Sequence, residues 1–367
     1  MQYLGDHSCQ DSSTHSGVDI CFARIHEIAG VAAKGTPETI YCALIQDFSR
    51  SIPLKQLLPY APSCQCLYTN TVPILVGKLV FTYLHSITRG IVTHLYTALL
   101  FTWTDYKTIF FPITAFACAT APVHSIRNLV DGWIWLWAHQ LLCNVSNQAN
   151  GSEDAMNKPW RPLPSGRITQ SQIKVLRWVV VLACILLSTL NGADMVLVSL
   201  ALTAVTTVYD EFGLSGHPFG KNACALGGYM AIELGTTKIM GRELDTVSKS
   251  AVVISGLLIL TTIHAQDFAD VEADAASGRV TFPIYAPRLS RLVTLTTAVA
   301  WSLGLSWYWK IGPTFEWMFI AMGTAIGLRY FFYRTRKADQ LSYILFNVWL
   351  MAAHVLPLNA RNGPLAC

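Results

Sequence analysis

Two segments of the chain place carboxylates and amides directly after long apolar runs. The first reads NQANGSEDAMNKPWRPLPSG (147–166) and the second QDFADVEADAASGRVT (266–281). In the second, Asp267, Asp270 and Asp274 are spaced i, i+3 and i+7, so a helix would carry all three on one face. Neighbouring carboxylates repel one another unless a cation joins them, and Mg²⁺ is a hard cation that prefers oxygen ligands. The spacing therefore predicts a Mg²⁺ site.

Basic residues follow both acidic clusters. Lys158 and Arg161 come after the first cluster, in which Asn147 and Asp154 share a helical face as i and i+7, and Arg279 comes after the second. Protein-bound Mg²⁺ is usually held by one or two carboxylates plus substrate phosphates. Arginine binds phosphate oxygens in bidentate fashion and lysine acts as a point charge. We therefore predict a site for a diphosphate that carries a long apolar tail.

The elements that must position these residues are apolar helices. Hydrophobic residues make up 52% of the 367 positions and charged residues only 13%, against about 25% in soluble domains. This composition predicts an all-α, polytopic membrane bundle, and the net charge of +4 without a basic tract argues against a nucleic-acid partner. Nine segments of nearly bilayer-spanning length are predicted: 107–124, 127–148, 172–190, 193–209, 221–237, 249–267, 290–308, 314–330 and 341–358.

Composition divides the chain into four regions. Residues 1–72 are mixed in composition and predict a non-membrane extension, and 73–106 predict an amphipathic helix on the membrane surface. Residues 107–358 form the predicted membrane-embedded catalytic domain, and 359–367 a short tail.

The distribution of basic residues predicts the orientation in the membrane. The loops that follow the acidic segments carry most of the lysines and arginines. The other side carries only four, namely Lys238, Arg242, Lys249 and Lys310. The positive-inside rule then places both acidic segments at the cytosolic face, and we expect an endoplasmic reticulum protein.

Both segments resemble the two Asp-rich motifs of the UbiA superfamily of intramembrane prenyltransferases. The first is similar to the form NQxxDxxxDxxNKPxxPLxSG and the second to DxxDxxGDxxxG, and the resemblance covers roughly 107–358. It implies a nine-helix bundle around a central cavity, in which Mg²⁺ bridges the two motifs and the substrate diphosphate. The resemblance implies that the metal is bound by Asn147, Glu153, Asp154, Asp267, Asp270 and Asp274. It assigns all of these except Glu153 to catalysis as well. Substrate binding falls to Lys158, Arg161, Tyr209, Lys221 and Arg279.

One position departs from the family pattern. Gly151 stands where the first motif usually has Asp, and alignment through the NKP sequence needs a one-residue gap, so Glu153 and Asp154 both remain candidate ligands. Loss of this carboxylate leaves the first metal site with less negative charge. It also favours a reaction other than the usual prenyl transfer.

Two enzymatic reactions remain open. The NKPWRPLPSGRI form and the N-terminal extension resemble fungal UbiA-like proteins of terpenoid pathways, some of which cyclise their substrate. We therefore expect a Mg²⁺-dependent sesquiterpene cyclase acting on farnesyl diphosphate, and the alternative is transfer of a prenyl group to an aromatic or quinone-type acceptor. A transporter would show internal repeats and broken helices near the bilayer midplane, and neither is evident.

His264 lies one turn before Asp267 on the same stripe. Two roles fit this position, proton uptake at the end of the reaction and a hydrogen-bonded core histidine, and the second is the preferred interpretation.

Overall fold

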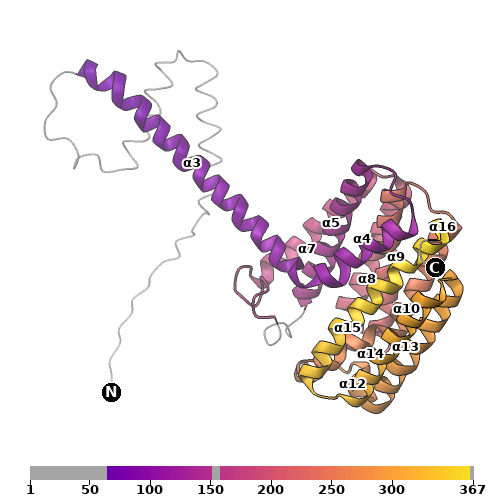
Figure 1. Ribbon diagram of the computed structural model, residues 1–367. Helices are drawn as coiled ribbons and strands as arrows, with labels where there is room; N and C mark the ends of the chain where they lie inside the picture. Colours follow the sequence, from indigo (N-terminus) through magenta and orange to yellow (C-terminus); the bar gives the residue numbers. More distant parts are fainter. Residues whose placement is uncertain (1–63, 151–157, 364–367) are drawn as a thin grey trace, which may run out of the picture. The chain divides into compact units, whose positions relative to one another are not determined.

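The computed structural model describes residues 64–150 and 158–363, and every regular element among them is helical (Figure 1). The chain divides into two compact units, Met1–Ile87 and Thr88–Cys367. Helix α3 (Cys64–Thr102) continues from the first unit into the second. It begins inside the predicted extension and runs through the predicted surface helix, whose placement on a membrane stays a prediction.

The second unit is a helical bundle, and each of the nine predicted segments coincides with one of its helices. These are α4 (Phe111–Thr120, preceded by η3, Tyr106–Phe110), α5 (Ile126–Asn150), α7 (Gln170–Thr189), α8 (Ala193–Glu211), α9 (Gly220–Gly241), α10 (Thr246–Thr262), α13 (Pro287–Trp309), α14 (Pro313–Phe332) and α15 (Arg336–Val355). Among the described residues, four stretches are long and apolar enough to cross a membrane: Gln170–Thr189, Ala193–Glu211, Thr246–Ala269 and Arg336–Arg361. The all-helical membrane fold is confirmed, and the count of nine crossings stays a prediction.

Apolar side chains cover the outside of the bundle, and polar ones lie within it. Val179, Leu182 and Leu186 follow the helical period along α7, and each is more than half exposed. Ser188 and Ser199, by contrast, are fully buried and hydrogen-bonded to each other at 2.6 Å. An apolar exterior of this kind suits a lipid environment, where the surrounding hydrocarbon replaces water.

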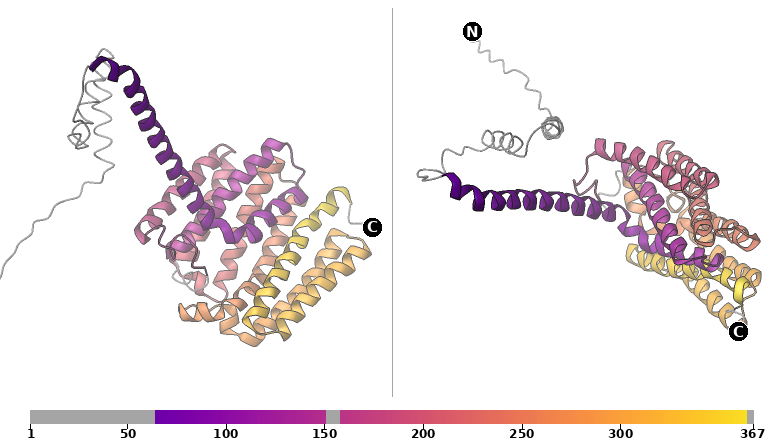
Figure 2. Two further views of the ribbon diagram at one scale, coloured as in Figure 1. Left: turned by 60° about the vertical axis from the view of Figure 1, so that its left-hand side comes forward. Right: turned by 90° about the horizontal axis from the view of Figure 1, so that it is seen from above.

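Helix α9 is central, because it packs against α4, α5, α8 and α10. Figures 1 and 2 show α5, α7 and α8 grouped together and α13, α14 and α15 grouped beside them. Close approach of α5 and α9 depends on Gly235, where an added Cβ would lie 2.3 Å from the Trp135 ring. Trp135 is itself fully buried and donates to Ser188 at 2.8 Å.

The sixth predicted segment is not one continuous α-helix. Helix α10 ends at Thr262 and is followed by the 3₁₀-helix η5 (Ile263–Ala269), then by α11 (Val271–Ala276) and α12 (Phe282–Tyr285). Tyr330 Oη donates to the carbonyl of Ala265 at 3.1 Å and so occupies one acceptor of the tightened turn.

The aspartate stripe survives this change of helix type. A 3₁₀-helix has three residues per turn, so residues three apart lie above one another. Asp270 N donates to Asp267 O at 3.1 Å, and Asp274 N donates to Asp270 O at 2.8 Å. Each aspartate therefore stands about one turn from the next, as the spacing predicts.

Candidate active site

A buried ion pair lies at the start of α9. Lys221, in the first turn of α9, donates from Nζ to Asp267 Oδ1 at 2.7 Å. Asp267 lies in η5 and is only 2% exposed. Burying either charge alone would cost several kcal/mol, so each one stabilises the other in its ionised form.

Asp274 lies beside Arg279 in a tight turn. Gly278 adopts φ +78°, which favours glycine, and lets Arg279 N donate to Asp274 O at 2.9 Å. The Arg279 guanidinium then lies 3.8 Å from Asp274 Oδ1. Val280 N donates to Gly216 O at 2.9 Å, which ties this turn to the connection between α8 and α9.

One carboxylate oxygen of this cluster has no hydrogen-bond partner among residues 64–150 and 158–363. Asp274 is 4% exposed, and its Oδ2 atom is buried without a hydrogen bond to any described residue. An ionised oxygen in this position costs free energy until a cation or a donor reaches it. The atom therefore fits a hard cation such as Mg²⁺.

Asp270, in the second acidic segment, is half-buried. Burial raises the pKa of its carboxyl above the ordinary value, and the positive charge of Lys158 opposes that shift. Lys221 and Arg336 act in the same direction as Lys158. The proximity of Lys158 brings the loop of the first segment to the carboxylates of the second, which the sequence predicted only by resemblance.

A largely apolar cavity of about 200 Å³ reaches Lys221, the partner of Asp267. Tyr209, Lys221 and Gln266 line it at its polar end. Its apolar lining includes Ile109, Ile113, Leu202, Val205 and Ile232. Tyr209 also lies within electrostatic range of Lys221, Arg279 and Asp267. A polar end joined to an apolar interior suits an anionic head with a hydrocarbon tail.

The described residues contain no group of three His, Cys, Asp or Glu side chains placed to hold a metal by themselves. Mg²⁺ usually takes only one or two carboxylates and completes its coordination with water and substrate phosphate. Asp267, Asp270 and Asp274 offer oxygen donors of the right chemistry, and no side chain in the described part of the chain competes for Asp274 Oδ2. The site therefore fits the metal when its substrate is present.

The first segment is only partly described. Asn147 lies half-buried near the end of α5, and beside it Gln148 is 1% exposed, with neither amide atom bonded to a described residue. Gly151, Glu153 and Asp154 lie outside the described residues. The choice between Glu153 and Asp154 therefore stays open.

Arg161 has partners of its own. It is 3% exposed, donates from Nη2 to Thr104 Oγ1 at 3.2 Å, and lies 3.8 Å from Asp105 Oδ2. This contact fixes the loop after the first segment against the start of the bundle. Contact of Arg161 with a diphosphate stays a prediction. Sequence reasoning missed Asp105, although a lone carboxylate before an apolar helix is a usable signal.

The interpretation of His264 as a core histidine is confirmed. Its side chain is 1% exposed and bonds Thr294 Oγ1 through Nε2 at 2.9 Å. Glu272 is exposed, and neither side chain is needed to complete the cluster.

Comparison with known proteins gives consistent matches. The model of the UbiA prenyltransferase family matches residues 108–351. The chain is 32% identical, over 74% of its length and 94% of the relative's, to fumagillin beta-trans-bergamotene synthase of Aspergillus fumigatus. It is 29% identical to a diterpene cyclase of Hericium erinaceus, over 58% of this chain and 72% of that one. Its fold is similar to a UbiA homolog from Archaeoglobus fulgidus bound to GPP and Mg²⁺, with TM-score 0.51 and 14% identity, covering 72% of this chain and 99% of that one.

Proposed function

Because the chain belongs to the UbiA prenyltransferase family, we propose that it is an integral membrane terpene cyclase that ionises farnesyl diphosphate and closes it to a sesquiterpene. The observation that carries the proposal is the buried cluster of Lys221, Asp267 and Asp274 at the polar end of an apolar cavity. The similarity to a bergamotene synthase supports cyclisation, with beta-trans-bergamotene as the first product to test.

The basic residues bind and orient the diphosphate. Lys221 pairs with Asp267, Arg279 lies beside Asp274, and Lys158 acts electrostatically on Asp270, so each carboxylate has a cation near it. Mg²⁺ held by Asp267, Asp270 and Asp274, with Asn147 and either Glu153 or Asp154, would supply the charge that stabilises the departing diphosphate. The ion pair of Lys221 keeps Asp267 ionised in a buried position.

The cavity governs the fate of the allylic cation. Its apolar lining excludes water, which would otherwise capture the cation as an alcohol. The distal double bonds of the same chain are then the available nucleophiles, and Tyr229 offers an aromatic ring on the cavity wall. Cation–π contacts of this kind contribute about 0.5–2 kcal/mol each.

The second candidate is transfer of the prenyl group to an aromatic or quinone-type acceptor. The activity named by the family model favours it. Loss of the middle motif carboxylate at Gly151 and the two cyclases among the relatives favour cyclisation. For either reaction we place the site at the cytosolic face of the endoplasmic reticulum, because the basic loops lie at that end of the bundle.

The test is to incubate membranes that contain the full chain with farnesyl diphosphate and Mg²⁺, without an acceptor, and to analyse the organic extract by gas chromatography with mass spectrometry. A cyclic C15 hydrocarbon that disappears on chelation and returns with Mg²⁺ is expected. An intact substrate that is consumed only when an aromatic acceptor is added would replace the cyclase with the transferase. Membranes containing the Asp267→Ala variant are the control.

A further inference from the structure

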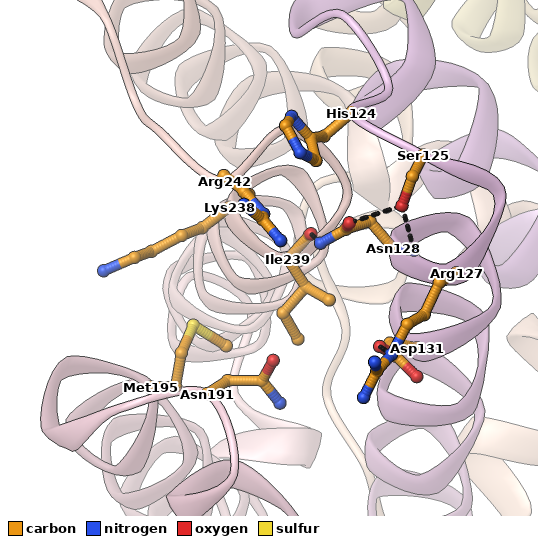
Figure 3. Close-up of a pocket in the computed structure, with 10 residues that line it drawn as sticks. All are labelled: His124, Ser125, Arg127, Asn128, Asp131, Asn191, Met195, Lys238, Ile239 and Arg242. Atoms are coloured by element: carbon orange, nitrogen blue, oxygen red, sulfur yellow. Dashed lines mark hydrogen bonds and ion pairs between the residues drawn. The ribbon is translucent and has the colours of Figure 1, made fainter.

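A second cavity, of about 590 Å³, lies where α5 begins, α7 turns into α8 and α9 ends (Figure 3). Its walls carry Arg127, Lys238 and Arg242 together with His124. It is separated from the carboxylate cluster by the length of α9, whose 22 residues rise about 33 Å. The hydrocarbon core of a bilayer is about 30 Å thick, so the cavity lies at the headgroup level of the opposite leaflet.

The walls of this cavity are held in place by hydrogen bonds. A helix usually leaves its last carbonyls to water or to a glycine turn, but the last carbonyls of α9 have protein partners. His124 N donates to Met240 O at 2.9 Å, and Asn128 Nδ2 donates to Ile239 O at 2.9 Å. Ser125 Oγ in turn donates to Asn128 Oδ1 at 2.7 Å (Figure 3). The start of α5 and the end of α9 are therefore fixed to each other.

Arg242 occupies a strained backbone position at the cavity. Its φ of +67° and ψ of −34° lie outside the ordinary helical and extended regions. Such a conformation costs a non-glycine residue about 1–3 kcal/mol, and strain of this kind clusters at ligand sites. Arg242 is exposed, and no carboxylate among the described residues pairs with it.

The other two cations at the cavity, Arg127 and Lys238, each have one carboxylate partner and can still bind another anion. Arg127 lies 3.7 Å from Asp131, and Lys238 pairs with Asp194. The Arg127 side chain is 89% exposed and the Lys238 pair is partly exposed. Exposed ion pairs contribute only about 0–1 kcal/mol, so a stronger anion should displace the carboxylates. The amino-terminal end of α5 adds the positive end of a helix dipole at the same place.

We propose that this cavity binds the phosphate group of an anionic phospholipid, in the leaflet opposite the prenyl diphosphate site. Arg242 and Arg127 supply the bidentate donors and Lys238 a point charge. A free phosphate ion offers the same chemistry. The position of the cavity at the headgroup level of the bilayer favours the lipid. The inference requires only a membrane-embedded bundle, so it stands apart from the reaction catalysed.

The test measures ligand binding to the purified full chain in detergent by native mass spectrometry and by the shift in Tm. The probes are phosphatidic acid, phosphatidylcholine and inorganic phosphate at constant ionic strength. Saturable binding of phosphatidic acid is expected, with inorganic phosphate at least about tenfold weaker because it lacks the acyl contacts. Equal binding of phosphatidic acid and phosphatidylcholine, or none of either, would overturn the proposal. Tighter binding of inorganic phosphate than of phosphatidic acid would show that the bound phosphate group does not belong to a lipid.

Variants separate ligand binding from folding. Arg242→Gly removes the charge but relieves the strain at positive φ, so it should keep or raise the Tm and weaken phosphatidic acid about tenfold. Arg242→Lys should lose less, because the charge remains. The matched control is Lys310→Ala, which removes a lysine at positive φ from the end of α13, outside the cavity lining. If Arg242→Gly and Lys310→Ala bind the lipid as well as the unaltered chain does, the cavity is not the site.

Discussion

Two buried ion pairs lie near η5, and they differ in how fully their atoms are used. Arg291 binds Asp339 with both terminal nitrogens, each at 2.9 Å, donates to Tyr330 O at 2.6 Å, and stacks 4.4 Å from the Phe268 ring centre. Lys221 reaches only Oδ1 of Asp267.

This difference indicates that the Arg291–Asp339 pair serves stability and that the Lys221–Asp267 pair is the better candidate for binding a ligand. The Arg291 pair engages both carboxylate oxygens of Asp339 and so ties α13 to the first turn of α15, and both residues also line a cavity of about 380 Å³. The Lys221 pair is a single point contact beside Asp274, whose Oδ2 has no described partner, and beside an open cavity. A buried pair that leaves acceptors unused is the one suited to bind a substrate.

The largest effect is expected from Asp267→Ala. Asp267 pairs with Lys221 and is proposed to hold the metal, so its loss should lower turnover of farnesyl diphosphate by about 1,000-fold, with membrane insertion intact. Product formation per unit of membrane-inserted protein measures it. Asp267→Asn keeps the size of the side chain and should be similarly inactive. Turnover near that of the unaltered chain in either variant would remove the metal site from this position.

Asp339→Ala should act on stability instead. Removing one partner of a buried pair leaves the Arg291 charge uncompensated and costs about 3–5 kcal/mol. The loss is read from the Tm in detergent, while turnover per folded molecule stays within about twofold. A fall in turnover at unchanged Tm would mean that this pair also serves the reaction.

Exchanging the two cations sharpens the comparison. Lys221→Arg places a bidentate donor on Asp267, so it should occupy the oxygen that a metal needs and lower turnover about 10–100-fold without loss of stability. Arg291→Lys removes the bidentate geometry and should cost about 1.5–3 kcal/mol of stability, with turnover retained. The same behaviour in both variants would show that the two pairs are equivalent.

A small effect is expected from pH at the opposite end of the bundle. Hydrogen bonds from Arg361 hold the pKa of Asp245 below its ordinary value, although burial opposes this. A lowered pKa stabilises the folded chain above about pH 4, and that contribution is lost as the pH falls further. Asp245 is half-exposed, so solvent weakens the pair. The Tm difference between the unaltered chain and Arg361→Ala should therefore shrink below about pH 4, and a constant difference would contradict this.

Much of the fold could be predicted because hydrophobic runs of spanning length are local signals. The spacing of Asp267, Asp270 and Asp274 was local too, and it survived the change from α- to 3₁₀-helix. The ion pairs could not be predicted, since Lys221 and Asp267 are 46 residues apart and Arg291 and Asp339 are 48 apart. Only the packing of distant helices determines which charges meet.

The cavity at Arg242 also brings together residues that are far apart in the sequence, namely Arg127 with Lys238 and Arg242. The prediction grouped Lys238 and Arg242 on one face and left out Arg127, although Arg127 begins the predicted segment 127–148 and so belongs to the same end. Arg127 starts a helix whose other end carries Asn147, so one helix connects the two ends of the bundle.

The 3₁₀ geometry of η5 also changes the reach of the chain. Each of its seven residues rises about 2.0 Å instead of 1.5 Å, so the segment is about 3.5 Å longer than an α-helix of equal length. Asp270 therefore lies farther along the bundle axis than an unbroken α10 would carry it, while Asp267 stays buried. Under the proposed function, the helix type would set how deeply a prenyl diphosphate enters before one cation can bridge its phosphates to both carboxylates.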